Sequence, residues 1–204
     1  HIKFSVAVES AKEHANGEWE VRFSDGRSAV YAGLVCCPGS NWTPRMPELK
    51  GVFLGRLIHA VDYKSPAEFA GKRVLVIGLG NSGADIACDA ARVGARAMVS
   101  VRRGYHIVPK HVFGVPLIDY LHNPDLTPES MRQLSLAEVL NVITGDPSRF
   151  GLPKPDHALL ESHPLLNTEI LHHFGHGRLH AKGPIERLDG GNVHFADGSV
   201  EAVD

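Results

Sequence analysis

The stretch Gly78-Leu79-Gly80-Asn81-Ser82-Gly83 decides the fold, because it fits the pattern GxGxxG and separates two segments of different periodicity. Before it, residues 74–77 form an apolar run typical of a strand buried on both faces of a parallel sheet. After it, residues 82–93 repeat apolar side chains at helical spacing, and Gly94 is placed to end the helix. Residues 97–101 then form a second apolar run. Strand, helix and strand in this order predict a βαβ unit.

Each glycine of the GxGxxG turn has its own physical task. Gly78 permits the tight turn, Gly80 lets the backbone approach a pyrophosphate, and Gly83 lets the helix pack closely on the strand. The free amides at the helix N-terminus point at phosphates, and Asn81 and Ser82 add side-chain donors. We therefore predict a dinucleotide-binding site on these residues; the alternative is a turn with a structural role alone.

The residues after the second strand distinguish between dinucleotides. NAD or FAD requires an acidic residue there, which accepts the ribose 2′-hydroxyl. Here the chain has Ser100-Val101-Arg102-Arg103, with two guanidiniums and no acid. Because guanidiniums suit a 2′-phosphate, we predict that Arg102 and Arg103 bind NADP(H). The alternative is a solvated pair of surface arginines.

Strand-like runs flank this central segment on both sides. Residues 2–13, 18–24 and 28–37 are separated by Asn16-Gly17 and Asp25-Gly26, pairs that favour tight hairpins, so they predict an antiparallel meander. Residues 192–196 lie between similar turns near the C-terminus. The first meander is echoed there, with Val21, Phe23, Asp25 and Gly26 recurring as Val193, Phe195, Asp197 and Gly198.

The segment between the second strand and the C-terminal hairpins is less regular. Thr127 as the N-cap and Pro128 at the first helical position predict a helix to about Ile143, ended by Gly145. Asn167 predicts the cap of another short helix, which stops near Gly175.

Composition and charge exclude several classes of function. The 204-residue chain has a formal net charge of -2, and its 21 Lys and Arg residues are scattered, so we expect no nucleic-acid partner. No apolar stretch reaches the ~20 residues that a membrane helix needs, so we expect no membrane partner either. A small-molecule partner and a cytoplasmic location are the expectation.

The three cysteines, Cys36, Cys37 and Cys88, have no CxxC spacing. The adjacent pair Cys36 and Cys37 lies inside an apolar run and is predicted to be buried as small hydrophobes, and a reducing compartment is expected. A disulfide reductase needs a redox-active CxxC pair, so this spacing disfavours that class.

Histidines cluster near the end of the second predicted short helix. A metal site on His172, His173, His176 and His180 is disfavoured, because Gly175 and Gly177 interrupt the helix and no acid or cysteine completes the set. No metal is therefore predicted.

The run Phe53-Leu54-Gly55-Arg56-Leu57-Ile58-His59-Ala60-Val61-Asp62-Tyr63 matches FxGxxxHxxxY. From the residues alone, 57–61 predicts a strand with His59 in the core or a loop. The pattern resembles the fingerprint of flavin-containing monooxygenases, and it precedes the GxGxxG as in that family. The resemblance implies that Phe53, Gly55, His59 and Tyr63 are fingerprint residues, with His59 and Tyr63 organising the junction of the NADP and flavin domains. It assigns no catalytic residue.

The resemblance covers nearly the whole chain, including residues 151–155 and 175–178 and the pair His163-Pro164. It implies an α/β fold in which a Rossmann-like NADP-binding domain with a parallel sheet, residues 39–183, is inserted in an FAD-binding domain. Residues 1–38 and 184–204 are then antiparallel β-meander pieces of a truncated FAD-binding domain. His1 in place of Met and the abrupt ends predict a region of a longer protein, partnered by the missing FAD-domain segments. The stiff segment 39–47, with Trp42, is the expected interdomain crossing.

The chain departs from the family at that crossing. Cys37-Pro38-Gly39 stands where Ala-Thr-Gly is common, and Ala32 replaces an acid that the family often has. These departures affect the details of the crossing and leave the resemblance intact.

The resemblance also implies the activity of the parent protein. Members use NADPH to reduce FAD and then oxygenate soft nitrogen or sulfur nucleophiles, so this region, without the FAD site, is expected to be inactive alone. A Baeyer–Villiger monooxygenase is the nearest rival, although its fingerprint usually ends in Trp where this chain has Tyr63. A binding module of another two-dinucleotide flavoprotein is a further alternative. The substrate and a homo-oligomer formed through exposed strand edges stay open.

Overall fold

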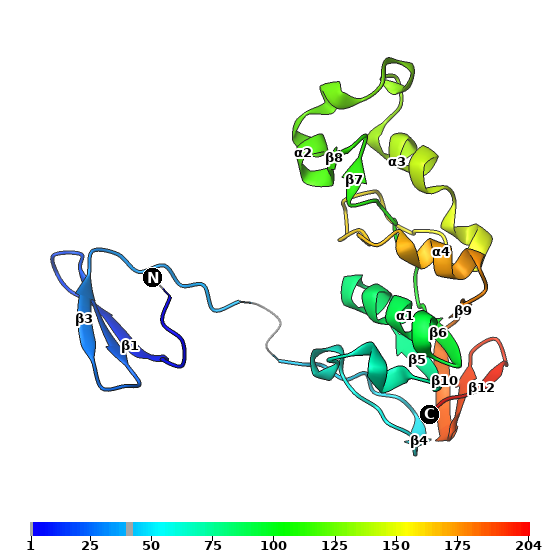
Figure 1. Ribbon diagram of the computed structural model, residues 1–204, viewed down its shortest axis with the longest axis horizontal. Helices are drawn as coiled ribbons and strands as arrows, with labels where there is room; N and C mark the ends of the chain where they lie inside the picture. Colours follow the sequence, from blue (N-terminus) through cyan, green and yellow to red (C-terminus); the bar gives the residue numbers. More distant parts are fainter. Residues whose placement is uncertain (1, 40–42) are drawn as a thin grey trace. The chain divides into compact units, whose positions relative to one another are not determined.

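The computed structural model describes residues 2–39 and 43–204, and contacts divide the chain into two compact units, His1–Pro44 and Arg45–Asp204 (Figure 1). The boundary between the units lies within the segment for which the sequence predicts a crossing. Two residues used in that analysis, His1 and Trp42, lie outside the described residues. Among the described residues, no helix combines the length and the apolar character needed to cross a membrane.

The first unit is the antiparallel meander that the sequence predicts. Its strands are β1 (Val8–Glu13), β2 (Trp19–Phe23) and β3 (Ser28–Tyr31), paired in the order β1-β2-β3. Gly17 and Gly26 have φ angles of 83° and 82°, which only glycine adopts without strain. Both turn predictions are confirmed.

The meander is shorter at both ends than predicted, and its cysteines are exposed. β3 ends at Tyr31 because its partner β2 begins at Trp19, and these two residues form the last pair. Among the described residues of this unit, no strand pairs with the chain beyond Tyr31. Cys36 and Cys37 are exposed there, so the prediction that they are buried is wrong.

The second unit contains the predicted βαβ element. β5 (Arg73–Ile77), α1 (Asn81–Val93) and β6 (Arg96–Ser100) follow one another, and β5 pairs in parallel with β6. β9 (Leu179–Lys182) joins in parallel on the other side of β6, which gives the order β5-β6-β9. The strand at 74–77 and the helix end at Gly94 are confirmed, but the prediction that this strand is buried on both faces is wrong. β5 lies at the edge of the sheet and Ile77 is 40% exposed, whereas β6 is the buried central strand.

The parallel sheet is covered on both faces. α1 and α4 (Glu169–Gly175) pack on one face (Figure 1), where they share a core with Ala97 and Val99 of β6. Met98, which alternates with them, packs on the other face against a second sheet. That sheet has the order β12-β11-β10-β4, with bounds Val200–Ala202, Asn192–Phe195, Ile185–Gly190 and Gly51–Phe53.

The repeated hairpin sequence forms the same turn in both units. The amide of Gly26 donates to the carbonyl of Phe23 at 3.0 Å, and the amide of Gly198 donates to that of Phe195 at 2.9 Å. In each turn, Oδ1 of the aspartate accepts the backbone amide two residues later, that of Arg27 at 3.1 Å and that of Ser199 at 2.9 Å. The repeated sequence therefore forms the same local turn geometry at both positions.

The irregular part of the second unit forms a small helical region with its own core. It contains β7 (His111–Val112), β8 (Val115–Pro116), α2 (Leu117–His122) and α3 (Leu136–Thr144). Short 3-10 helices complete the unit at Ala60–Asp62, Pro66–Phe69, Pro124–Leu126, Glu129–Met131 and Pro147–Phe150. The buried hydrophobic side chains of its core are Val108, Val112, Tyr120, Val139 and Leu140.

The predicted helix start at Thr127 and Pro128 is wrong, whereas its end at Gly145 is confirmed. The hydroxyl of Thr127 is used in the core instead, 2.7 Å from the hydroxyl of Tyr120. α3 begins at Leu136, because Ser135 and Glu138 form a reciprocal capping box.

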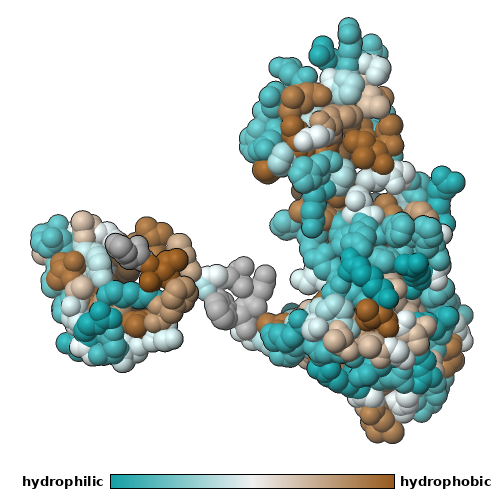
Figure 2. All heavy atoms as spheres, in the orientation of Figure 1, coloured by the Kyte–Doolittle hydropathy of each residue, from teal (hydrophilic) through white to brown (hydrophobic). Residues whose placement is uncertain are grey.

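Exposed apolar side chains gather near β4 (Figure 2). Val52 is 66% and Leu54 80% exposed there. The fingerprint segment therefore starts on an apolar surface of the second unit.

Candidate functional site

The glycine-rich turn joins β5 to α1 as its spacing predicts. Gly78 has a φ angle of 92°, and its amide donates to the carbonyl of Ser100 at the end of β6, at 2.9 Å. A Cβ atom at position 83 would lie 2.4 Å from the carbonyl oxygen of Gly78, so only glycine fits there. A Cβ at Gly80 would meet no atom within 4 Å. The space beside Gly80 is thus open to an approaching group.

The N-terminus of α1 leaves its first amides free of a cap. Gly80 is the N-cap residue, and no side chain of the described residues accepts a hydrogen bond there. The first-turn amides have no acceptor within the helix, and the helix dipole places partial positive charge at this end. Ser82 is exposed beside them. This end of the helix can therefore bind an anion.

Asn81 is held by another part of the chain. Its Oδ1 accepts the backbone amide of Leu166 at 2.7 Å, and its Nδ2 donates to the carbonyl of Pro164 at 3.4 Å. The sequence gives no sign of this contact, because 83 residues separate Asn81 from Pro164.

The two arginines after β6 are both exposed but differ in their contacts. Arg103 donates from Nη2 to Oγ of Ser162 at 2.8 Å, and its guanidinium lies 5.7 Å from the ring centre of Tyr105. Arg102 has no side-chain partner within the described part of the chain. Arg102 is therefore the guanidinium that is free to bind a ligand.

His59 occupies a turn where the residues alone predict a strand. β4 ends at Phe53, and residues 60–62 form a 3-10 helix, so the predicted strand at 57–61 is wrong. Nδ1 of His59 accepts the backbone amide of Val61 at 3.2 Å, which caps that helix. Because Nδ1 accepts, the neutral ring carries its proton on Nε2 and keeps one donor for another group.

Tyr63 closes the same 3-10 helix and anchors it to α1. Its ring stacks on Phe69, with centroids 5.0 Å apart, and its hydroxyl donates to Oδ2 of Asp89 at 2.8 Å. Burial and the bond to the Asp89 carboxylate raise the pKa of the Tyr63 phenol well above its usual range. The phenol therefore stays protonated and keeps this bond.

In the first half of the fingerprint, the Phe53 side chain reaches the core, whereas Leu54 is 80% exposed. Phe53 packs against the buried cluster of the second sheet. A Cβ at position 55 would lie 2.6 Å from the Phe53 ring, so Gly55 leaves room for that ring. Phe53 and Gly55 thus shape the segment that carries His59.

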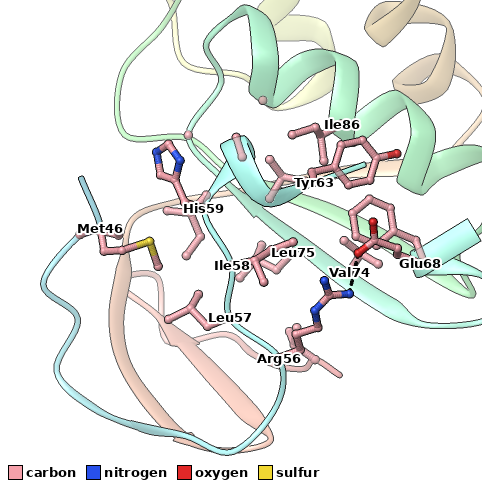
Figure 3. Close-up of a pocket in the computed structure, with 18 of the residues that line it drawn as sticks. Met46, Arg56, Leu57, Ile58, His59, Tyr63, Glu68, Val74, Leu75 and Ile86 are labelled. Carbon is pink, nitrogen blue, oxygen red and sulfur yellow. Dashed lines mark ion pairs between the residues drawn. The ribbon is translucent and has the colours of Figure 1, made fainter. Parts of the chain in front are cut away.

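His59 and Tyr63 share one pocket of about 320 Å³ with the glycine turn (Figure 3). Gly78, Gly80 and Gly83 line it, as do residues 74–77 of β5. The pocket continues to an ion pair between Nη1 of Arg56 and Oε2 of Glu68 at 2.6 Å. Arg102 and Arg103 lie outside this lining. The second half of the fingerprint and the glycine turn therefore line one pocket, and the arginine pair at the end of β6 lies outside its lining.

Folding also brings together three groups that the sequence does not connect. Ligand atoms of Cys88, Glu169 and His173 lie within 4.8 Å of one another, so an acid and a cysteine do accompany His173. Burial raises the pKa of the Cys88 thiol to about 12, and Glu169 already accepts from Arg92 and from His173. These contacts describe a structural cluster, with Glu169 bridging α1 and α4.

Comparisons with known proteins match this chain over its whole length. The family model described as "FMO-like: Flavin-binding monooxygenase-like" matches residues 1–204. The indole-3-pyruvate monooxygenase YUCCA1 of Oryza sativa subsp. japonica is 32% identical over 99% of the chain. Human flavin-containing monooxygenase 5 is 32% identical over 98% of it. The chain covers 52% and 41% of these two proteins, so it spans about half of their length or less.

Solved structures share the fold at lower identity. The flavin-containing monooxygenase from Stenotrophomonas maltophilia has a TM-score of 0.60 at 20% identity, over 99% of this chain and 48% of its own. Cyclohexanone monooxygenase from Rhodococcus sp. Phi1, solved bound to NADP+, has a TM-score of 0.62 at 21% identity, over 100% of this chain and 51% of its own. The match of the family model to every residue carries the assignment: this chain belongs to the flavin-binding monooxygenase-like family.

Proposed function

We propose that this chain is the NADP(H)-binding region of an FAD- and NADPH-dependent monooxygenase. The observation that carries the proposal is the geometry of three glycines at the start of α1. Gly78 has a positive φ, the space beside Gly80 is open, and Gly83 leaves no room for a side chain next to the Gly78 carbonyl. A pyrophosphate needs this combination of an uncapped helix end and a bare backbone. In this proposal residues 39–183 form a Rossmann-like NADP-binding domain, and residues 1–38 and 184–204 belong to the FAD-binding domain.

Each residue of the site has a defined task in binding. The first-turn amides of α1 and the hydroxyl of Ser82 hold the pyrophosphate, and Arg102 binds the 2′-phosphate. His59 offers the Nε2 proton to the bound dinucleotide from the pocket wall. NADPH supplies a hydride when it is bound. The chain's own residues orient the dinucleotide and donate hydrogen bonds to it.

The residues present do not fit a second dinucleotide. The sequence has one GxGxxG, and it serves the site described above. We therefore assign no FAD-binding residue to this chain and expect no oxygenation by the 204 residues alone. NADPH-dependent S-oxygenation by this chain after addition of FAD would contradict that expectation.

We propose that the whole protein oxygenates soft nitrogen or sulfur nucleophiles. The support is the fingerprint, whose end in Tyr63 resembles that of the N- or S-oxygenating type. The Baeyer–Villiger type is the second candidate, because cyclohexanone monooxygenase shares the fold with a TM-score of 0.62. Assay of a chain extended to the length of its relatives, with a thioether and with a cyclic ketone, distinguishes the two.

Calorimetric titration of the chain with NADP+ and with NAD+ tests the cofactor assignment. We expect tighter binding of NADP+, and we expect Arg102→Ala to remove most of the difference, because its guanidinium is free to pair with the 2′-phosphate. Arg22→Ala, which removes an exposed arginine from β2, is the matched control and should leave both affinities unchanged. Equal affinity of the wild-type chain for the two dinucleotides, or binding of neither, contradicts the proposal.

A further inference from the structure

One loop connects the two parts of the proposed dinucleotide site. This segment, residues 162–167, is called the clamp loop here. At its start, Oγ of Ser162 accepts a hydrogen bond of 2.8 Å from Nη2 of Arg103. At its centre, the carbonyl of Pro164 and the amide of Leu166 are both bound by the side chain of Asn81. The loop therefore contacts the end of β6 and the start of α1 at once.

The C-terminal end of the clamp loop is also held by hydrogen bonds to other segments. Asn167 is buried, and its Nδ2 donates to Oδ1 of Asp85 at 2.6 Å. Its Oδ1 accepts the amide of Ile170 at 3.3 Å, which ties the loop to α4. Leu165 is buried as well, and its amide donates to the carbonyl of His106 at 2.9 Å. Ser162 is thus presented to Arg103 by a segment held at several points.

Arg103 is oriented by this arrangement. A free arginine side chain has many rotamers, and fixing them costs conformational entropy when a ligand binds. The hydroxyl of Ser162 and the ring of Tyr105 restrict Arg103 before any ligand arrives. Arg102, beside it in the sequence, has no such restraint from the described residues.

We infer that Ser162 is a positioning residue for 2′-phosphate recognition: it holds Arg103 so that the guanidinium pair favours NADP(H) over NAD(H). The inference rests on the proposed function and extends it to a loop outside the GxGxxG motif. Arg102 binds the phosphate directly, and Arg103 adds a pre-oriented positive charge whose direction Ser162 sets. Cofactor selectivity therefore depends on a residue 59 positions away from the arginine that it holds.

A double-mutant cycle on the full chain tests this role. The quantity measured is the selectivity ratio, the Kd for NAD+ divided by the Kd for NADP+, obtained by calorimetry for each variant. Ser162→Ala removes the acceptor and should lower the ratio by about three- to tenfold, as expected for the net contribution of one hydrogen bond at an exposed site. Arg103→Ala should lower it at least as much. The double variant should resemble Arg103→Ala, because Ser162 acts through Arg103.

Ser162→Thr is the matched control, because it keeps the hydroxyl and should keep the ratio within about twofold of wild type. A structural role alone would lower the affinities for both dinucleotides together and leave the ratio unchanged. An unchanged ratio in Ser162→Ala, with Arg102→Ala still removing selectivity, overturns this inference and leaves the proposed function intact. Loss of selectivity by additive, independent effects of Ser162→Ala and Arg103→Ala also overturns it.

Discussion

The hydroxyl of Tyr63 donates to Oδ2 of Asp89 at 2.8 Å and so ties the end of the fingerprint to the side of α1. Asp89 is paired in turn with Arg92, and Arg92 with Glu169 of α4. One line of polar contacts therefore runs from the fingerprint across α1 to α4. This contact explains why a tyrosine hydroxyl, and not only an aromatic ring, is useful at position 63.

Tyr63→Phe should lower the free energy of unfolding by about 1 to 2 kcal/mol, because it removes a hydrogen bond to a charged group while the stacking on Phe69 is kept. Denaturant unfolding followed by circular dichroism measures the change. Tyr31→Phe, at an exposed position of β3, should change the stability much less. A similar loss in both variants would show that the Asp89 contact contributes nothing specific.

Gly83→Ala and Gly80→Ala should separate folding from binding. At position 83 the new methyl would meet the Gly78 carbonyl at 2.4 Å, so the turn must shift, and we expect a loss of about 1 to 3 kcal/mol in stability. At position 80 the methyl meets no protein atom within 4 Å, so the chain should fold with a smaller loss. That methyl would fill the space through which a pyrophosphate approaches, and NADP+ affinity should fall by about tenfold or more. Thermal unfolding and calorimetry give the two numbers, and wild-type affinity in Gly80→Ala would contradict the site.

His59→Ala should destabilise the 3-10 helix that follows β4, because it removes the side-chain acceptor for the Val61 amide. The expected cost is about 1 kcal/mol in the free energy of unfolding. His59→Asn keeps an acceptor at the cap and should recover most of this loss. Hydrogen exchange at the Val61 amide, which should be faster in the alanine variant alone, reports the cap directly.

Glu169 should contribute to the acid sensitivity of the fold. Burial acts to raise the pKa of its carboxyl, but the hydrogen bonds from Arg92 and His173 outweigh burial and lower the pKa below the ordinary glutamate value of 4.5. A carboxyl with a lowered folded-state pKa binds fewer protons when folded than when unfolded. Its stabilisation is therefore present above about pH 4.5 and is lost as the pH falls through the folded-state pKa.

Glu169→Gln should accordingly flatten the dependence of unfolding free energy on pH between about 5 and 3, while it lowers the stability at neutral pH. Denaturant melts at several pH values measure the slope. Glu186→Gln, on β10, makes the same change of charge outside this cluster and serves as the control. Parallel slopes for wild type and Glu169→Gln would rule out the assigned role.

The parts of the fold that could be predicted from the sequence are those with local causes. The strand before Gly78, the helix after Gly80 and the turns at Gly17, Gly26 and Gly198 each depend on the conformations available to a few adjacent residues. The resemblance at Phe53 to Tyr63 likewise uses residues within one short segment. The predictions at Thr127 and at Cys36 and Cys37 were wrong because packing, which these local patterns do not record, decided them: Tyr120 takes the Thr127 hydroxyl, and among the described residues no strand pairs with the first unit beyond Tyr31.

By itself the sequence determined the βαβ element, the glycine turn and the resemblance to flavin-containing monooxygenases. Only the tertiary structure decided which arginine is free, which loop holds Arg103, and that His59 and Tyr63 face the same pocket as the glycines. The physical reason is the range of the interactions. Backbone conformation and helix capping act between close neighbours, whereas the contacts Asn81–Leu166, Arg103–Ser162 and Tyr63–Asp89 arise only when segments 85, 59 and 26 residues apart pack together.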